Sequence, residues 1–188
     1  WLEHFGLAKG VAPADHGRDR PRINVVIDED GRMVDLRSVG QGLSQVLPVL
    51  MQCLLAPPSG SVVVVEQPEL HLHPRLESQL ADFFLACART GRQVIVETHS
   101  EHLINQIRLQ VAEDESNETR DLVRVYFAEQ RDGATTFKSA ELDPYGGLAG
   151  DWPPEFLDLN LEAAERLIDA AIAKRLSELP PDDDEEDL

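Results

Sequence analysis

Two polar segments follow apolar runs in this sequence, and their residue types suit the binding of a divalent cation beside a polyphosphate. Four consecutive valines, at positions 62–65, lead directly into Glu66-Gln67-Pro68-Glu69, and Val94-Ile95-Val96 leads into Glu97-Thr98-His99-Ser100. A carboxylate at the rim of a dry sheet must be paired or must meet a cation. Mg²⁺ bound to a nucleotide polyphosphate meets that need with few protein carboxylates. For Glu66 taken alone, a strand that ends in a solvated glutamate is the competing interpretation.

A third segment, Ser38-Val39-Gly40-Gln41-Gly42, has the composition of an anion-binding turn. Apolar residues at helical spacing follow it, which predicts a helix that begins near Gly42. The N-terminus of such a helix carries free N–H groups and a partial positive charge, and glycines let the backbone approach an anion closely. Taken alone, the segment is equally typical of an ordinary helix-capping turn.

The residues between the first two polar segments predict a strand–helix–strand unit. Residues 62–65 form a β-branched run, residues 93–97 contain a second one at 94–96, and residues 75–90 place one apolar face at helical spacing. A strand–helix–strand connection of this length is almost always a right-handed crossover between parallel strands. Strands that are apolar on both faces predict a sheet covered on both sides. Ligands bind outside the carboxyl ends of parallel strands, which is where both polar segments fall.

The remaining patterns predict an α/β fold: a mainly parallel sheet flanked by helices, then a β-hairpin and a C-terminal helix. Residues 23–36 alternate around Asp30-Gly31 and predict a hairpin, and so do residues 122–129 and 134–142 around Asp132-Gly133. Amphipathic helices are expected after Ser100 and over residues 160–179.

The composition limits the partners. The 188 residues carry a formal charge of −18, so the surface as a whole does not suit a phosphate backbone. No apolar run reaches the ~20 residues of a membrane-spanning helix. Cys53 and Cys87 lie in apolar helical patterns, which predicts buried free thiols in a reducing cytoplasm. The acidic residues at 182–187 predict a disordered tail, and a start at Trp1 without Met suggests a fragment or a processed product.

Together, three segments resemble one family of proteins. SVGQGLSQ, VVVVEQPELHLHP and VIVETHS resemble the signature, the Walker B and D-loop, and the switch-histidine segments of ABC-type ATPases, in that order. They are most similar to the branch of RecF, SMC and overcoming-lysogenization-defect proteins. DWPPEFLD, at 151–158, looks like a C-terminal module of a bacterial subgroup of these ATPases. The resemblance implies the C-terminal lobe of an ABC-type P-loop NTPase head, with a β-rich lead-in at 1–37, the ATPase core lobe at 38–142, a helical module at 143–179 and the tail at 180–188.

The resemblance also implies a nucleotide site shared between two subunits, with ATP and Mg²⁺ as cofactors. Glu66 would take the place of the Walker B acid and order Mg²⁺ with its water, and His99 would sense the γ-phosphate. His73 belongs to the segment that would form the D-loop between the subunits. The signature contacts to a γ-phosphate held by the opposite subunit would be Ser38, Gly40, Gln41 and Gly42. We expect the loops bearing Ser38, Glu66 and His99 to converge on one polyphosphate pocket.

The sequence departs from the family at the catalytic base. The family carries a glutamate after the Walker B acid, and Gln67 stands there in this chain. An amide does not accept a proton from the attacking water, and general-base catalysis typically supplies about 10²–10⁴-fold in rate. Three alternatives stay open: Glu69 is the base, hydrolysis is slow and nucleotide acts as a clamp, or Gln67 orients the water without deprotonating it. The catalytic candidates are therefore Gln67, Glu69 and His99.

A second departure is the lack of a phosphate-binding loop. The motif G-x-x-x-x-G-K-[ST] needs a Gly-Lys pair, and none of Lys9, Lys138 and Lys174 follows a glycine. We therefore expect an N-terminal ATPase half with the Walker A loop to complete the site, and this chain alone to be inactive. A zinc-type site at His71 and His73 lacks further ligands, and a serine hydrolase lacks the G-x-S-x-G elbow.

The predicted function is ATP binding and slow hydrolysis by a head that dimerises around ATP–Mg²⁺ in the cytoplasm. By analogy with the family, its role lies in DNA repair or anti-phage defence, with DNA or an effector nuclease as open alternatives for the partner. The competing hypothesis is a regulatory scaffold with a degenerate head that does not hydrolyse ATP, and Gln67 favours it.

Overall fold

The computed structural model describes residues 1–14 and 22–149 of the chain. The chain divides into two compact units, Trp1–Asp151 and Trp152–Leu188, and the described residues belong to the first. The predicted helix at 160–179, the module at 143–179 beyond Ala149, the DWPPEFLD segment and the acidic tail lie outside the described residues. Within the described ranges, no helix is long and apolar enough to cross a membrane.

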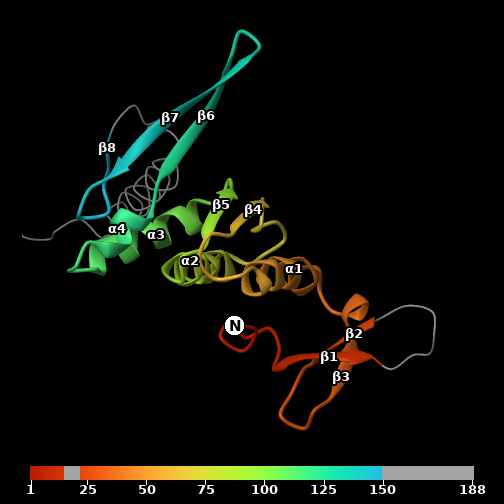
Figure 1. The fold of residues 1–188 in the computed structure, drawn as a ribbon. Coiled ribbons are helices and arrows are strands. Elements are labelled where there is room, and N and C mark those ends of the chain that lie inside the picture. Colours follow the sequence, from red (N-terminus) through yellow and green to blue (C-terminus); the bar gives the residue numbers. More distant parts are fainter. Residues whose placement is uncertain (15–21, 150–188) are drawn as a thin grey trace, which may run out of the picture. The chain divides into compact units, whose positions relative to one another are not determined.

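The first elements form a small antiparallel sheet (Figure 1). The strands are β1 (Gly10–Ala14), β2 (Arg22–Val26) and β3 (Met33–Asp35), in the order β1-β2-β3. The pair β2–β3 confirms the hairpin predicted around Asp30-Gly31, and Gly31 has the positive φ of 74° that a tight turn requires. Strand β1 was not predicted, because its sequence GVAPA is poor in strand-forming residues. Its Pro13 is tolerated because β1 lies at the edge of this sheet.

A parallel strand pair with a crossover helix follows, as the sequence predicts. Strand β4 (Val62–Glu66) pairs in parallel with β5 (Gln93–Glu97), and helix α2 (Pro74–Arg89) connects them. Pro74 stands in the first turn of α2, where its missing N–H costs nothing. Helix α1 (Gln41–Leu55) precedes this unit, and Figure 1 shows α1 and α2 beside β4 and β5.

The core of this region lies on one face of the β4–β5 pair. Val63 and Val65 point into it and are 3% and 6% exposed. They form one apolar cluster with side chains of α1 and α2, among them Leu43, Val46, Leu50, Leu80, Phe83 and Phe84. This packing stabilises the strand edge on which the polar segments lie.

The prediction of a sheet covered on both faces is wrong for the described part of the chain. Val62, Val64 and Ile95 lie on the other face and are 57%, 54% and 47% exposed. Each strand is apolar on both faces, but helices of the described residues pack on one face alone. The apolar pattern of a strand indicates which of its faces are suited to burial, but it does not indicate which segment covers them.

Two further helices and a second antiparallel sheet complete the described part. Helix α3 (Glu101–Glu113) begins after Ser100 as predicted, and the short helix α4 (Glu118–Leu122) follows it. Strands β6 (Val125–Arg131) and β7 (Ala134–Leu142) form the hairpin predicted around Asp132-Gly133, and β8 (Leu148–Ala149) pairs with the end of β7. The fold is therefore mixed α/β, with one parallel strand pair and helices on its buried face.

Candidate functional site

The carboxyl ends of β4 and β5 bring two glutamates side by side. Glu66 and Glu97 are paired in the strand register, so their side chains leave the sheet on the same face. Both are exposed. The strand ends are held together by the backbone N–H of Gln67, which donates to the carbonyl oxygen of Glu97 at 2.8 Å. Like charges on neighbouring strands repel, and a divalent cation between the two carboxylates would relieve that repulsion.

The loop after β4 is compact and wound by local turns. The backbone N–H of Leu72 donates to the carbonyl oxygen of Glu69 at 2.9 Å, and that of Leu70 donates to Gln67 at 3.3 Å. Gln67 and His71 have positive φ angles of 44° and 62°, which residues other than glycine rarely adopt. Such conformations persist where the surroundings hold them, and they concentrate at functional sites.

His73 ends this loop as the N-cap of α2. Its Nδ1 accepts a hydrogen bond from the backbone N–H of Arg75 at 3.2 Å. An accepting Nδ1 carries no proton, so the hydrogen bond selects the ring with its proton on Nε2. The imidazole is exposed, and Nε2 is the nitrogen that can meet a partner.

Glu69 connects this loop to the loop after β5. Its Oε1 accepts a hydrogen bond from the backbone N–H of His99 at 2.7 Å. The imidazole of His99 is 73% exposed, and its Nε2 lies 3.4 Å from Oε1 of Glu97, an ion pair when the ring is protonated. The loop that carries the predicted phosphate sensor is therefore attached to the loop that carries Gln67.

Ser100 makes a second connection between the same two regions. Its hydroxyl oxygen caps α3 by accepting from the backbone N–H of Leu103 at 3.0 Å, and it donates to Oε2 of Glu77 at 2.5 Å. Ser100 is buried, and Glu77 lies in the first turn of α2. The starts of α2 and α3 are thereby held together.

The signature-like turn has an open helix N-terminus. Ser38 ends a short 3-10 helix (Leu36–Ser38), and Gly40 is the N-cap of α1 without a side-chain hydrogen bond to the first N–H groups. Ser38, Gly40 and Gln41 are exposed. A helix end of this kind offers unpaired N–H groups to an anion.

Gly42 joins this turn to the loop after β4. A Cβ atom at Gly42 would stand 3.2 Å from Cδ2 of Leu72 and 3.3 Å from the carbonyl oxygen of His71. The close approach explains a small residue here and connects the signature-like and D-loop-like segments directly.

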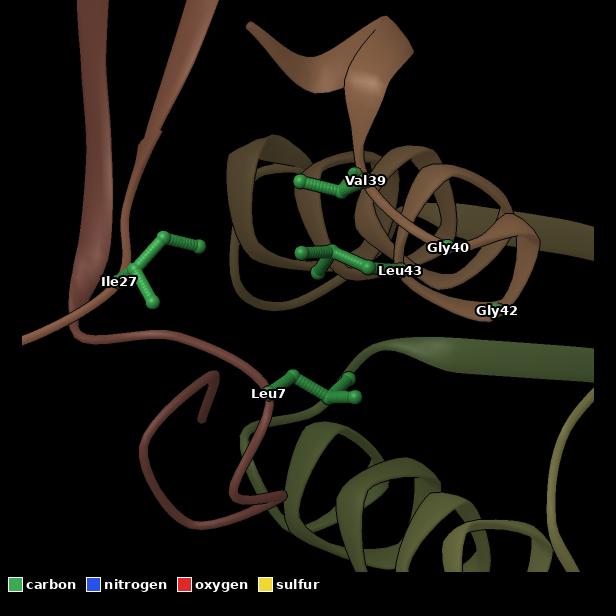
Figure 2. Close-up of a pocket in the computed structure, with 6 residues that line it drawn as sticks. All are labelled: Leu7, Ile27, Val39, Gly40, Gly42 and Leu43. Carbon is green, nitrogen blue, oxygen red and sulfur yellow. The ribbon is translucent and has the colours of Figure 1, made fainter. Parts of the chain in front are cut away.

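An apolar cavity of about 400 Å³ opens beside the signature-like turn (Figure 2). Its six lining residues are Leu7, Ile27, Val39, Gly40, Gly42 and Leu43. Figure 2 shows the side chains of Ile27 and Leu43 extending toward each other. Glu66 and His99 do not line this cavity.

The prediction that the loops of Ser38, Glu66 and His99 converge on one pocket is not confirmed, because the structure brings the predicted residues together in two groups. Glu66, Gln67, Glu69 and His99 gather at the carboxyl edge of β4–β5, while Ser38, Gly40, Gln41 and Gly42 form the start of α1. Sequence reasoning gave no role to Glu97 or Glu77. The position of Glu97 at the end of a buried run was visible in the sequence, but its pairing with Glu66 depends on the strand register.

The carboxylates at the strand edge suit magnesium and do not suit a closed metal cage. In the described ranges, no group of three or more His, Cys, Asp or Glu side chains has the geometry to hold a metal. Mg²⁺ needs one or two carboxylates when phosphates and waters supply its other ligands. Glu66 and Glu97 provide that number, and zinc would need more protein ligands.

Comparisons with known proteins found two similarities. Residues 14–105, just under half of the chain, match the family model described as an AAA domain, putative AbiEii toxin, type IV TA system. A solved SMC ATPase structure, from work on ATP-driven dimerisation and DNA-stimulated activation of SMC ATPases, aligns with a TM-score of 0.50 and 11% identity. The alignment covers 88% of this chain and 94% of that chain. No curated protein matches the sequence.

The matched segment and the fold indicate a class of protein. Residues 14–105 are similar to an AAA domain, and the chain has a mixed α/β fold similar to that of an SMC ATPase head, which supports an ABC-type P-loop ATPase-like domain. These similarities support a nucleotide-binding, ATPase-type function.

Proposed function

We propose that this chain binds ATP–Mg²⁺ and supports slow ATP hydrolysis as the C-terminal half of an ABC-type ATPase head. The observation that carries the proposal is the meeting of Glu66, Gln67, Glu97 and His99 at one edge of a parallel strand pair. In this arrangement Glu66 and Glu97 would hold Mg²⁺, which would supply positive charge against the phosphates, and the imidazole of His99 would donate to the γ-phosphate. Gln67 orients the attacking water.

A second segment that carries the Walker A loop completes the site in this proposal. The uncovered face of the β4–β5 pair supports this, because Val62, Val64 and Ile95 form an apolar strip beside the two carboxylates. An apolar face next to a catalytic edge is covered in an assembled α/β domain. The chain by itself is then inactive.

Two heads then assemble around ATP, with the signature-like turn of one head meeting the γ-phosphate bound to the other. The uncapped N-terminus of α1 supports this role, since its N–H groups have no side-chain cap. In such a dimer, the strand-edge residues of one chain serve one nucleotide site, and the signature-like turn of the same chain serves the other site. The similar SMC ATPase is described as dimerising under ATP, and we extend that property to this chain as a proposal.

Nucleotide-dependent assembly of the complete protein tests this proposal. Equilibrium sedimentation with ATP, with ADP and without nucleotide is expected to give dimers with ATP alone, which dissociate as ATP is consumed. Glu66→Gln is expected to raise the Mg²⁺ concentration that this dimerisation requires by about tenfold or more, because one carboxylate ligand is lost. Glu115→Gln, an exposed carboxylate in the loop before α4, is the matched control and keeps wild-type behaviour.

The second candidate is a regulatory scaffold with a degenerate head that does not hydrolyse ATP, and Gln67 favours it. Dimers that form equally with and without nucleotide would establish the scaffold and reject the ATPase proposal. A role in DNA repair or anti-phage defence, with DNA or a nuclease as partner, follows from the family resemblance. We place the protein in the cytoplasm, and the buried free thiols Cys53 and Cys87 support a reducing compartment.

A further inference from the structure

One oxygen of the Glu69 carboxylate accepts a hydrogen bond within the protein, and the other is buried. Its Oε1 accepts the backbone N–H of His99 at 2.7 Å, across thirty positions of sequence. Its Oε2 is buried and has no hydrogen-bond partner among the described residues. A general base needs an oxygen that reaches the attacking water, and neither oxygen of Glu69 is placed for that.

The position of Glu69 suits a structural carboxylate. His99 directly precedes Ser100, the N-cap of α3, so the Glu69 carboxylate lies at the positive end of that helix. A carboxylate that accepts a backbone N–H makes a charge-assisted hydrogen bond, which is about twice as strong as a neutral one. This contact fixes the backbone from which the His99 imidazole projects.

A second carboxylate, on the first turn of α2, makes a similar connection to the next residue of the same loop. Glu77 on α2 accepts the hydroxyl of Ser100 at 2.5 Å, so two adjacent residues of the switch loop are held by two residues of the segment after β4. The same segment contains His73 and contacts Gly42 of the signature-like turn through Leu72. These contacts form a continuous connection from His99 to the loop that faces a second subunit in the proposed assembly.

We propose that Glu69 is a positioning residue that couples the phosphate-sensing His99 to the loop at 67–73, and that it is not the catalytic base. This inference rests on the proposed function for the role of His99. The contact between Glu69 and His99 is independent of it.

Two substitutions of similar size separate positioning from base catalysis. Glu69→Gln keeps a side-chain oxygen that accepts the His99 N–H, but it removes the basic group. Glu69→Met keeps the length of the side chain and removes the acceptor. Positioning therefore predicts that Gln is tolerated and Met is not, whereas base catalysis predicts that both abolish hydrolysis.

The experiment uses the complete protein and three readouts: amide hydrogen exchange at His99, the ratio of ATP to ADP affinity, and single-turnover hydrolysis. We expect E69M to speed exchange at His99 and to lower the ATP-over-ADP preference, each by about tenfold or more, because a hydrogen bond to a charged acceptor is lost. E69Q is expected to stay within about threefold of wild type in all three. Glu115→Gln is the matched control.

A double-mutant cycle with His99→Ala identifies the route of the effect. If Glu69 acts through His99, the E69M change adds little to the ATP-over-ADP loss that H99A causes by itself. A general loss of folding would instead lower ATP and ADP affinity equally. If E69M does not fold, Glu69→Asp replaces it, since its carboxylate is one methylene too short to keep the contact.

The outcomes are distinct. If E69Q abolishes hydrolysis while amide exchange at His99 is unchanged, Glu69 is the base and the proposal is overturned. Unchanged exchange at His99 in E69M would also overturn the proposal. If the wild-type protein binds neither nucleotide, the proposed function fails, and His99 exchange in E69M and E69Q then decides by itself whether Glu69 holds the switch loop.

Discussion

At the residue scale, the rate of the proposed ATP hydrolysis depends on the residue that follows Glu66. Gln67 lies at the strand edge with a positive φ, and its backbone N–H is used to hold β4 against β5. The backbone contact does not depend on the side chain, so Gln67 can be exchanged for glutamate without disturbing the loop. An amide can orient water but does not remove its proton.

Gln67→Glu is therefore expected to raise single-turnover ATP hydrolysis by the complete protein by about 10²-fold or more, since it supplies a general base at this edge. Gln93→Glu makes the same chemical change at the opposite end of β5 and is the matched control. An unchanged rate in Gln67→Glu would contradict the role of Gln67 as the residue that limits hydrolysis.

The two cysteines are a second residue-scale feature, because they lie together in the core. Burial raises the pKa of the Cys53 thiol to about 11, with the neighbouring Cys87 adding to the effect. Burial also raises the pKa of Cys87, although Arg92 opposes the shift. Both thiols therefore stay protonated at neutral pH and react poorly, because the thiolate is the nucleophile.

The raised pKa predicts the direction of a stability change with pH. The unfolded thiol loses its proton near pH 8.5, whereas folded Cys53 keeps it until about pH 11, so the stabilising contribution is complete below pH 8.5 and is lost as the pH rises toward 11. Denaturant unfolding is expected to show that the free energy of unfolding decreases less between pH 8 and pH 10.5 for Cys53→Ala than for wild type. Equal decreases would show that Cys53 does not contribute.

At the element scale, a glycine in the turn after β7 connects the second antiparallel sheet to α3. The carbonyl oxygen of Gly146 accepts from Nε of Arg108 at 2.8 Å. Gly146 has a φ of 75°, and a Cβ atom there would stand 2.3 Å from the carbonyl oxygen of Arg108. Both the backbone conformation and the lack of space require glycine.

Gly146→Ala is expected to destabilise the protein more than Gly133→Ala. Gly133 also has a positive φ, of 79°, but nothing lies within 4 Å of its Cβ position, so its substitution costs only the backbone strain of about 1–2 kcal/mol. Gly146→Ala adds a steric clash with backbone, so its cost is expected to exceed that of Gly133→Ala by about 1 kcal/mol or more. Thermal unfolding of the two variants measures the difference, and equal Tm values would contradict the predicted clash.

At the scale of the whole molecule, the face of β4–β5 that the described residues leave uncovered offers a test of the proposed second segment. If a further segment covers this face, Val64→Asp buries an unpaired charge and costs several kcal/mol in the complete protein, on the order of 3–5. If the face stays in water, the cost is that of an ordinary surface change, within about 0.5 kcal/mol. Ser139→Asp, at an exposed position of β7, is the control.

We expect the larger cost, because Val64 is 54% exposed in this chain but lies beside Glu66 and Ile95 on the apolar strip that a Walker A segment would cover. Chemical denaturation of the complete protein gives the free energy of unfolding for both variants. A Val64→Asp value equal to that of Ser139→Asp would contradict a completed sheet.

The sequence alone determined the elements that short-range physics controls. The β-branched runs at 62–65 and 94–96 predicted β4 and β5, the spacing of apolar residues predicted α1, α2 and α3, and Asp132-Gly133 predicted the β6–β7 hairpin. It also predicted that Glu66 and His99 follow parallel strands at one edge. These features depend on periodicity and turn chemistry, which neighbouring residues set.

Only the tertiary structure decided what each side chain meets. It placed Glu97 beside Glu66, and it showed that the Glu69 carboxylate accepts the backbone N–H of His99. It also left one face of β4–β5 uncovered by the described residues. Strand register and contacts across thirty or more positions depend on how packed elements align in space. A pattern read along the chain records which residues avoid water, and it does not record the partner that each one finds.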